Sequence, residues 1–355
     1  MRIAHLIWGM KTGGAELLLI DIVNEQVRTN SVALYVVNRD VEAELLSKVD
    51  ARVKVVCISR PSSSRNPYFI LKLIFWLALF SPDVIHAHQC SLIRFLKFLS
   101  VPKILTVHGT DLPLVEDIRL FTAVVGISES VKKDVEMRVE GLSCSVIHNG
   151  VSPYKIGRKT DYSAERCRIV QVGRLVHETK GQDVLLRALA DLRATELDAI
   201  SLEFAGDGSS RDYLESLTRQ LGLEGVVCFL GGVPREYVYS RLREYDLLVQ
   251  PSRIEGFGLT IVEALLAGVP VLVSDLDGPM EVIDSGERGY YFECGDHQSC
   301  ANAIREFLTA RRKPETVALR QQEIRKETLV RYDIGRTADD YVQLYKGVSL
   351  RARSG

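Results

Sequence analysis

Residues 255–271 read EGFGLTIVEALLAGVPV, and this stretch decides how the second half of the chain folds. Its first glycines allow a tight turn in which the backbone approaches a ligand closely, because glycine has no side chain. An apolar helix is predicted from near Leu259, and Gly268-Val-Pro270 ends it before an apolar strand at 271–274. A turn, a helix and a buried strand in succession are typical of an α/β sheet.

The same stretch carries two carboxylates, Glu255 in the turn and Glu263 inside the helix. The first turn of a helix offers unpaired N–H groups and a positive dipole end, which suit a phosphate. We therefore expect Glu255 beside phosphates and Glu263 one turn deeper, where ribose hydroxyls could meet it. The alternative is a glycine-bounded turn with two solvated acids.

Apolar runs separated by helical patterns extend this organisation over the whole chain. Strands are predicted at 3–8, 32–37, 53–58, 84–88, 104–108, 123–128, 145–148, 169–173, 202–205, 227–230, 247–250, 271–274 and 290–292. Helices are predicted at 183–193, 211–221 and 261–267, and the chain after about residue 315 is helical and charged. Near-continuous apolar strands alternating with helices predict two successive doubly wound α/β units with parallel sheets. The polar segment 151–167 is the expected boundary.

Bulk properties narrow the class of protein. A chain of 355 residues suggests two domains. Its 45 basic and 46 acidic side chains nearly balance, so no global field points to nucleic acid. The seven cysteines form no C-x-x-C pair and are expected to be mostly buried thiols of a cytosolic protein. The apolar N-terminus indicates a first strand, not a signal peptide, and the run 68–80 is too short to span a bilayer.

Unusual sequences follow two predicted strands of the first half. Gly13-Gly14-Ala-Glu16 opens a helix and could contact a diphosphate through backbone N–H groups. It lacks the G-x-G-x-x-G spacing, which argues against a nicotinamide site. His108-Gly-Thr-Asp111 ends another strand and could point into a crevice. The alternatives are a simple turn and a loop with a hydrogen-bonded histidine.

Cations follow the first strand of the second half. Arg174 and Lys180 could neutralise a diphosphate leaving group without a metal, unless they are merely solvated loop cations. Gly206-Asp207-Gly208 predicts a tight turn near the nucleotide. Asp275-Leu-Asp277 is interpreted as a turn, and metal binding there is the alternative.

The segment 52–103 carries many bases, among them Lys72, Arg94 and Lys97, and its one acid is Asp83. Aromatic and aliphatic residues lie between the bases, so this surface could meet anionic lipid headgroups. The alternative is a set of ordinary amphipathic helices packed on a sheet, with bases that snorkel to water.

Taken in order, these motifs resemble one family over nearly the whole chain, the retaining glycosyltransferase family 4. The motifs are Gly13-Gly14-x-Glu16, His108-Gly-x-Asp111, Ser128-Glu129, Asn149-Gly-Val151, Gly173-Arg174-Leu175, Lys180-Gly181, Gly206-Asp207-Gly208 and the pair Glu255/Glu263. The resemblance implies the GT-B architecture, two facing Rossmann-like domains with a cleft between them. It further implies an acceptor-binding domain at 1–152 with a returning C-terminal helix at about 336–355, and a nucleotide-sugar-binding domain at 153–335.

The resemblance also implies roles for single residues. Arg174 and Lys180 would hold the diphosphate, and Glu255 would contact hydroxyls of the donor sugar. Glu263 would contact the ribose, and His108 would lie near the donor sugar and the reacting centre. The N–H groups of Gly256, Phe257, Gly258 and Leu259, with the Gly13-Gly14 turn, would flank the phosphates, and Gly206 and Asp207 would lie near the nucleotide.

The resemblance implies retaining transfer of a hexosyl or N-acetylhexosaminyl group to a glycan or lipid-linked acceptor in surface polysaccharide assembly, and no metal is expected. The loop Ser274-Asp-Leu-Asp277-Gly-Pro-Met-Glu281 departs from the family pattern because Asp277 replaces a glycine. Its Gly-Pro-x-Glu form resembles family members that use UDP-sugars, so a UDP-sugar is expected over a GDP-sugar. A cytoplasmic protein is expected, and attachment to the inner face of the cytoplasmic membrane stays open. Alternative functions are a nucleotide-sugar epimerase, a phosphorylase and a non-catalytic sugar-nucleotide-binding protein.

Overall fold

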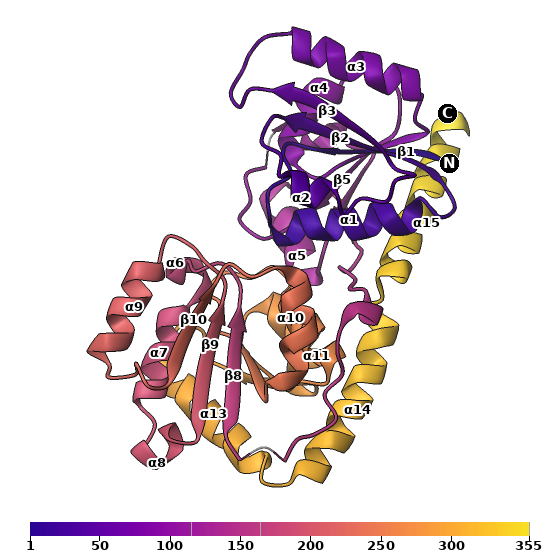
Figure 1. Ribbon diagram of the computed structural model, residues 1–355. Helices are drawn as coiled ribbons and strands as arrows, with labels where there is room; N and C mark the ends of the chain where they lie inside the picture. Colours follow the sequence, from indigo (N-terminus) through magenta and orange to yellow (C-terminus); the bar gives the residue numbers. More distant parts are fainter. Residues whose placement is uncertain (115, 164, 355) are drawn as a thin grey trace. The chain divides into compact units, whose positions relative to one another are not determined.

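The computed structural model describes residues 1–114, 116–163 and 165–354 (Figure 1). The chain divides into two compact units. Unit 1 comprises Met1–Val151 and Tyr332–Gly355, and unit 2 comprises Ser152–Arg331.

Unit 1 is a parallel sheet with the strand order β3-β2-β1-β4-β5-β6-β7. Its strands are β1 (Arg2–Ile7), β2 (Ser31–Asn38), β3 (Lys54–Arg60), β4 (Val84–Ala87), β5 (Lys103–Val107), β6 (Ala123–Gly126) and β7 (Cys144–Val146). Its helices are α1 (Gly14–Gln26), α2 (Ala43–Leu46), α3 (Tyr68–Phe80), α4 (Ile93–Leu96), α5 (Glu129–Arg138) and α15 (Ile334–Ser354). Helices cover both faces of the sheet, so its central strands are apolar and buried (Figure 1).

The C-terminal helix α15 packs beside α1, although the two helices lie more than 300 residues apart in the chain (Figure 1). Its aromatic side chains Tyr341 and Tyr345 are fully buried against unit 1. The end of the chain is therefore part of the core of unit 1.

Unit 2 is a second parallel sheet, with the strand order β10-β9-β8-β11-β12-β13. Its strands are β8 (Cys167–Val172), β9 (Ile200–Ala205), β10 (Val227–Gly231), β11 (Leu247–Gln250), β12 (Val271–Ser274) and β13 (Tyr290–Phe292). Its helices are α6 (His177–Lys180), α7 (Gln182–Ala190), α8 (Ala194–Leu197), α9 (Arg211–Gln220), α10 (Arg235–Arg241), α11 (Leu259–Ala267), α12 (Asp277–Val282), α13 (His297–Ala310) and α14 (Pro314–Arg331).

The prediction of two parallel doubly wound sheets is confirmed. The strands predicted at 247–250, 271–274 and 290–292 have the observed bounds, and α11 begins at Leu259 as expected. Most of the cysteines are buried, as predicted. Within the described residues they are free thiols, and 90, 144, 167 and 300 are buried, whereas Cys57 and Cys228 are exposed. None of the described helices is both long enough and apolar enough to cross a bilayer.

Candidate functional site

In unit 2 the chain turns in opposite directions from the neighbouring strands β8 and β11. Strand β9 lies on the far side of β8, and β12 lies on the far side of β11. In open parallel sheets, ligands bind at such a switch point, beyond the carboxyl ends of the strands. The loops after β8 and β11 carry Arg174, Lys180 and Glu255, so these three residues come from the two strands at the switch point.

Close backbone contacts hold these loops together. A Cβ atom on Gly181 would lie 1.8 Å from the carbonyl oxygen of Pro251. The segment after β8 therefore packs directly against the loop after β11. A Cβ atom on Gly206 would lie 1.9 Å from the carbonyl oxygen of Gly173, which joins the β9 loop to the β8 loop. A side chain at either position would force the loops apart.

The centre of this cluster is an ion pair between the loops. Lys180 donates a hydrogen bond from Nζ to Oε2 of Glu255 at 2.7 Å, and Gln250 Nε2 donates to the same oxygen at 3.2 Å. Within the described residues, no protein donor bonds Oε1 of Glu255. One carboxylate oxygen is therefore fixed by the protein, and the other can accept a hydrogen bond from a ligand hydroxyl.

Arg174 differs from Lys180. Its side chain is exposed, and within the described residues its guanidinium has no acidic partner. Its backbone carbonyl accepts a hydrogen bond from Gln182 Nε2 at 2.9 Å, which fixes the loop while the guanidinium stays available to an anion.

Glu263 lies inside α11 and is 7% exposed. Its Oε1 accepts a hydrogen bond from the Tyr239 hydroxyl at 2.8 Å and lies 3.7 Å from Nε of Arg235. Both partners belong to α10, so the carboxylate is held between two helices. A buried carboxylate with fixed partners is a preorganised acceptor.

The remaining residues predicted for the nucleotide lie in the same loops. Gly256, Phe257 and Gly258 are buried directly before α11, and Leu259 is its first residue. Asp207 accepts a hydrogen bond at Oδ1 from the N–H of Gly208 at 2.8 Å, and its Oδ2 lies 3.6 Å from Arg211. Asp207 thus stabilises its own turn.

Sequence reasoning missed several residues of this site. Arg253 binds Asp183 in a two-pronged ion pair, with N–O distances of 2.7 and 2.9 Å. Gln250, Tyr239 and Arg235 hold the two predicted carboxylates. Of these, only Gln250 left a signal in the sequence, because it is a polar residue that ends the apolar strand β11.

In unit 1, Gly13 and Gly14 lie where α1 begins after β1, and His108 directly follows β5. His108 is half-buried, and its Nε2 lies 3.1 Å from Nδ1 of the buried His88. His86 lies in β4 and His88 directly follows that strand, and His86 is paired in register with His5 of β1. The His-Ala-His spacing places two imidazoles on one face of the sheet.

The histidines of unit 1 are held uncharged. Burial lowers the pKa of His108 to about 4. Burial also lowers the pKa of His5 to about 4, although its hydrogen bond to Gln26 acts in the opposite direction. Burial first, and neighbouring histidines second, hold the pKa of His86 and of His88 well below the usual range.

Among the residues that the structure describes, three of these histidines are close enough together to ligate a metal ion. His5, His86 and His88 form a cluster of three possible ligands. The nitrogens of this cluster already take part in hydrogen bonds, to Gln26, Thr106, Tyr345 and other histidines. Asp275 is exposed and accepts a hydrogen bond from the N–H of Cys294 at 2.8 Å, and Asp277 begins α12.

The three bases singled out for a membrane lie in different environments. Lys72 donates a hydrogen bond to the carbonyl oxygen of Ile58 at 2.9 Å, so it turns back onto β3. Arg94 and Lys97 are exposed at α4. The structure therefore leaves two of the three cations accessible.

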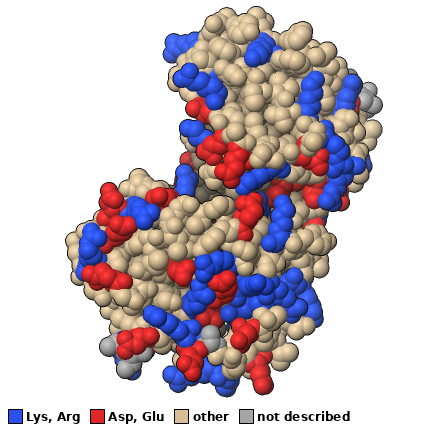
Figure 2. All heavy atoms as spheres, viewed as in Figure 1, with Lys and Arg blue, Asp and Glu red and all other residues tan. Residues whose placement is uncertain are grey.

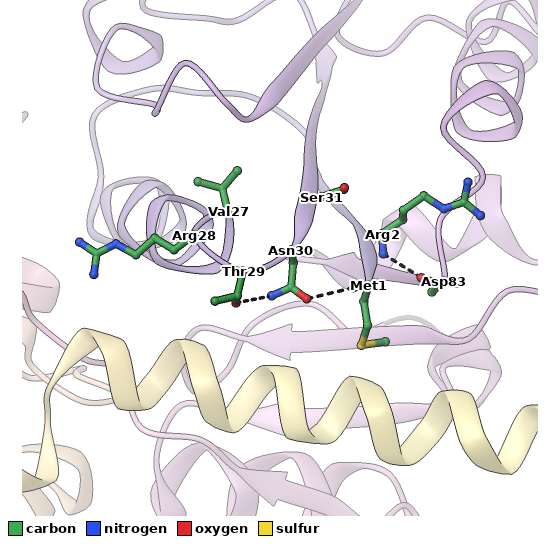
Figure 3. A pocket seen from close by; sticks show the side chains of 8 residues that line it. All are labelled: Met1, Arg2, Val27, Arg28, Thr29, Asn30, Ser31 and Asp83. Atoms are coloured by element: carbon green, nitrogen blue, oxygen red, sulfur yellow. Dashed lines mark hydrogen bonds between the residues drawn. The ribbon is translucent and has the colours of Figure 1, made fainter.

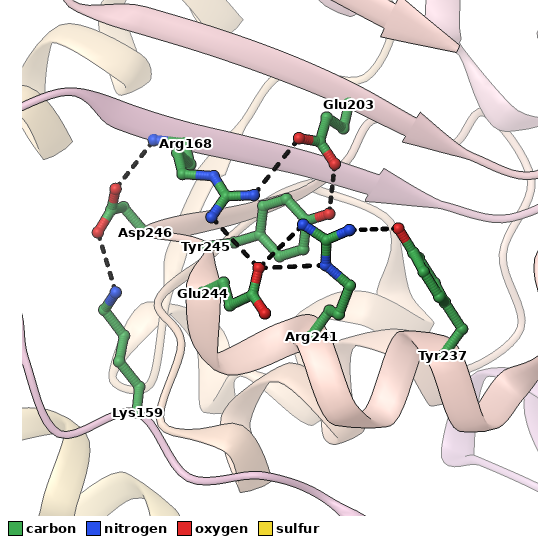
Figure 4. Close-up of polar contacts among 8 residues, drawn as sticks. All are labelled: Lys159, Arg168, Glu203, Tyr237, Arg241, Glu244, Tyr245 and Asp246. Carbon is green, nitrogen blue, oxygen red and sulfur yellow. Dashed lines mark hydrogen bonds and ion pairs between the residues drawn. The ribbon is translucent and has the colours of Figure 1, made fainter. Parts of the chain in front are cut away.

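Two polar clusters lie away from the switch point. A depression in unit 1 is lined by Met1, Asn30 and Asp83 at the amino ends of the strands, where Asp83 accepts a hydrogen bond from the N–H of Arg2 at 2.8 Å (Figure 3). In unit 2, Lys159 and Asp246 form a buried ion pair at 3.0 Å (Figure 4). Both clusters lie at the end of a sheet opposite to the predicted ligand side, so we interpret them as structural.

Comparison with known proteins agrees with this geometry. The model of the glycosyl transferases group 1 matches residues 157–324, and the model of glycosyltransferase family 4 matches residues 12–155. Together the matches cover most of both units. The chain belongs to the group 1, family 4 glycosyltransferases.

Individual relatives are more distant. An uncharacterized glycosyltransferase of Methanocaldococcus jannaschii, MJ1607, is 30% identical over 63% of the chain and 59% of its own length. The lipopolysaccharide core biosynthesis glycosyltransferase LpsE of Rhizobium meliloti is 31% identical over 52% of each chain. These matches thus span between half and three fifths of the length of the relatives.

A solved structure resembles the whole chain. The crystal structure of Anabaena HepE in complex with UDP and glucose matches with a TM-score of 0.81 and 22% identity, over 98% of this chain and 100% of that one. This likeness establishes the fold, two Rossmann-like domains of the GT-B class.

Proposed function

We propose that the chain is a retaining glycosyltransferase that moves a sugar from a UDP-sugar to a glycan or lipid-linked glycan acceptor, without a metal. The observation that carries this proposal is that the segments following β8 and β11, at the switch point of unit 2, carry the exposed Arg174 and the ion pair of Lys180 and Glu255. Two cations and one half-open carboxylate match a diphosphate joined to a sugar, because the cations suit phosphate oxygens and the carboxylate suits hydroxyls.

The chemistry follows from that charge pattern. The bond between the anomeric carbon and the diphosphate breaks, and a bond from that carbon to the acceptor oxygen forms on the same face. The acceptor proton passes to an oxygen of the leaving diphosphate. Arg174, Lys180 and the positive end of α11 stabilise the charge on the leaving group, which is where a preorganised site lowers the barrier.

Further residues are assigned on the same basis. Glu263 would accept hydrogen bonds from the ribose, with Tyr239 and Arg235 holding it in place. The backbone at Phe257 and Leu259 would face the phosphates. Gly206 and Asp207 would shape the turn beside the nucleotide. His108 and the Gly13-Gly14 turn would lie near the donor sugar and its phosphates.

Support for UDP comes from the HepE crystal structure, whose complex contains UDP and glucose. The Gly-Pro-x-Glu sequence at the start of α12 also favours UDP by its resemblance to family members that use UDP-sugars. A Cβ atom on Gly278 would lie 2.6 Å from the backbone carbon of Gly256, so this segment contacts the turn that bears Glu255. Unit 1 is proposed to bind the acceptor, and likeness to LpsE supports an acceptor of the lipopolysaccharide kind.

The proposal is tested by incubating the protein with UDP-sugars, GDP-sugars and a panel of glycan and lipid-linked acceptors. Transfer with an unchanged anomeric configuration, seen by NMR of the product, is the expected result. Conversion of the donor to its epimer, or sugar release that depends on phosphate, would assign the epimerase or the phosphorylase instead. Binding without turnover over the whole panel would favour a non-catalytic protein.

A second proposal concerns the partner surface of unit 1, which we propose binds an anionic bilayer. Helix α3 has 13 residues, and only Leu73 and Leu77 among them are buried. Tyr68, Leu71, Phe75 and Leu79 are between 58% and 65% exposed, at spacings that place them along one side of the helix. Figure 2 shows unit 1 as largely uncharged over its upper part, with Lys and Arg side chains around that area.

The length of α3 favours a position in the plane of the interface. At about 1.5 Å per residue it is roughly 20 Å long, shorter than the ~30 Å hydrocarbon layer. Large apolar side chains each contribute about 1.5–3 kcal/mol when fully buried, and the exposed Arg94 and Lys97 of the same unit can meet lipid phosphates. A row of exposed apolar side chains along one helix is suited to an interaction site.

Vesicle flotation tests this surface. The protein should float with phosphatidylglycerol vesicles and less with phosphatidylcholine vesicles. The double variant Leu71→Glu/Phe75→Glu should stay in solution, whereas Leu319→Glu, a change of an equally exposed leucine in unit 2, should float as before. Equal flotation of all three proteins, or none of the unmodified protein, would refute the proposal.

A further inference from the structure

A continuous chain of hydrogen bonds runs from His108 into the core of unit 1. Nε2 of His108 lies 3.1 Å from Nδ1 of His88, and Nε2 of His88 lies 3.1 Å from Nδ1 of His5. Nε2 of His5 in turn lies 2.8 Å from Oε1 of Gln26. Each link joins two imidazoles or an imidazole and an amide, so each needs one donor and one acceptor.

The Gln26 amide determines which nitrogen carries each proton. Because its oxygen can only accept, His5 must donate from Nε2 and, being neutral, must accept at Nδ1. His88 then donates from Nε2 and accepts at Nδ1. By the same step His108 donates from Nε2, and its Nδ1 carries a lone pair. Within the described residues, no protein group bonds that Nδ1 atom.

A second branch from Gln26 fixes the orientation of its amide. The hydroxyl of Tyr345 lies 2.6 Å from Nδ1 of His86, and a phenol donates to an imidazole because it is the stronger acid. Tyr345 has then used its proton and can only accept from Gln26, whose Nε2 lies 3.5 Å away. The amide nitrogen therefore faces Tyr345, and the amide oxygen faces His5.

We propose that Gln26, His5 and His88 are positioning residues that hold His108 as the neutral Nε2–H tautomer, with Nδ1 as an acceptor for a ligand hydroxyl group. This inference rests on the proposed function only for the identity of the ligand, a hydroxyl of the donor sugar or acceptor. A histidine with this tautomer accepts a hydrogen bond and cannot donate one at that atom. It therefore selects a hydroxyl over a phosphate oxygen.

The tautomer is measured on the unmodified full chain without ligand, by long-range ¹H–¹⁵N NMR with ¹⁵N-labelled histidine at pH 7.5. The expected spectrum shows a protonated Nε2 and an unprotonated Nδ1 for His5, His88 and His108. A protonated Nδ1 on His108, or an imidazolium, would overturn the proposal. This result does not depend on activity, so absence of glycosyl transfer would leave it intact and would refute only the proposed function.

Variants test whether the chain acts from a distance. Gln26→Leu removes the acceptor and should move the His108 signals, three hydrogen bonds away, while those of His177 and His297 in unit 2 stay in place. In the same variant kcat should fall about tenfold, the worth of one hydrogen bond, with little change in the donor KM.

Gln321→Leu is the matched control, because Gln321 is an equally buried glutamine of unit 2. It should move neither the His108 signals nor kcat. Unchanged His108 signals in Gln26→Leu would show that Gln26 does not set the tautomer. If Gln26→Leu fails to fold, the spectrum of the unmodified protein still decides the proposal.

Discussion

Both units have a parallel sheet, but the side chains at and beyond their central strands differ in charge. They are neutral in unit 1 and charged in unit 2. In unit 1, strands β1, β4 and β5 bring together His5, His88 and His108, which burial keeps neutral. In unit 2, strands β8 and β11 bring together Lys180 and Glu255, which remain an ion pair at 2.7 Å. The same architecture thus supports a neutral, mostly buried hydrogen-bond network in one unit and an ion pair in the other.

The buried ion pair of unit 2 should have the largest effect on stability. Lys159 and Asp246 are 6% and 5% exposed, and Asp246 also accepts a hydrogen bond from the N–H of Arg168 at 2.9 Å. Asp246→Ala leaves a buried charge without its partner, which costs about 3–5 kcal/mol. Urea denaturation should show this loss, and a loss below ~1 kcal/mol would mean that the pair contributes little.

Activity should depend most on the switch-point carboxylate. Glu255→Ala should lower kcat on the order of a hundredfold to a thousandfold, because an interaction with the reacting sugar is lost. Glu224→Ala, which removes an exposed carboxylate from a loop of the same unit, serves as the control. Full transfer by Glu255→Ala, with both variants folded by circular dichroism, would contradict the assigned role.

Acid should destabilise unit 1 more than unit 2. The folded state lowers the pKa of His5 and His108 to about 4, so unfolding takes up protons below the ordinary pKa of about 6.5. Their contribution to stability is complete above pH ~6.5 and is lost as the pH falls toward 4, at about 1 kcal/mol per pH unit for each histidine.

Hydrogen exchange at pH 7.5 and pH 5 measures this difference by unit. Protection should fall more in β1, β4 and α15 than in β8 and β11, since Tyr341 and Tyr345 of α15 pack on the histidines. Within the described residues, the groups that bond to or pack on His5 and His86 are Gln26, Thr106, these two tyrosines and the neighbouring histidines, and none of them is a carboxylate. Equal loss of protection in both units would contradict the claim that the histidines make unit 1 more sensitive to acid than unit 2.

The smallest effect is expected at a surface pair. Lys326 and Glu323 lie 2.8 Å apart on α14 but are 59% and 69% exposed. Lys326→Ala should change the free energy of unfolding by at most ~0.5 kcal/mol, because water screens such pairs. Measured beside Asp246→Ala, it shows how far burial, rather than charge alone, sets the cost. A loss as large as that of Asp246→Ala would contradict this.

The sequence predicted what depends on local pattern. Apolar runs located the strands, and the glycines and proline around 255–271 located the turn and both ends of α11. It did not predict that Tyr239 and Arg235 hold Glu263, because those contacts join separate helices. Nor did it predict the link from His108 to Gln26, since periodicity does not reveal which strands are neighbours. His108 was the member of that cluster that the sequence singled out, and the spacing of His86 and His88 was a signal that was not used.

The segment 52–103 of unit 1 differs from its prediction in which side chains are exposed. Its bases suggested an electrostatic surface, yet Lys72 bonds the carbonyl oxygen of Ile58. The apolar side of α3 is exposed instead. Residue type alone could not separate a buried from an exposed apolar helix, because that depends on what packs against it.

The most direct test of the account is a thermal shift with UDP, GDP and ADP, each with and without EDTA, on the unmodified chain and on Lys180→Ala. We predict that UDP raises the melting temperature most, that EDTA makes no difference, and that Lys180→Ala loses most of the shift. A shift that EDTA removes would assign a metal to Asp275 and Asp277, and no shift with any nucleotide would contradict the proposed donor site.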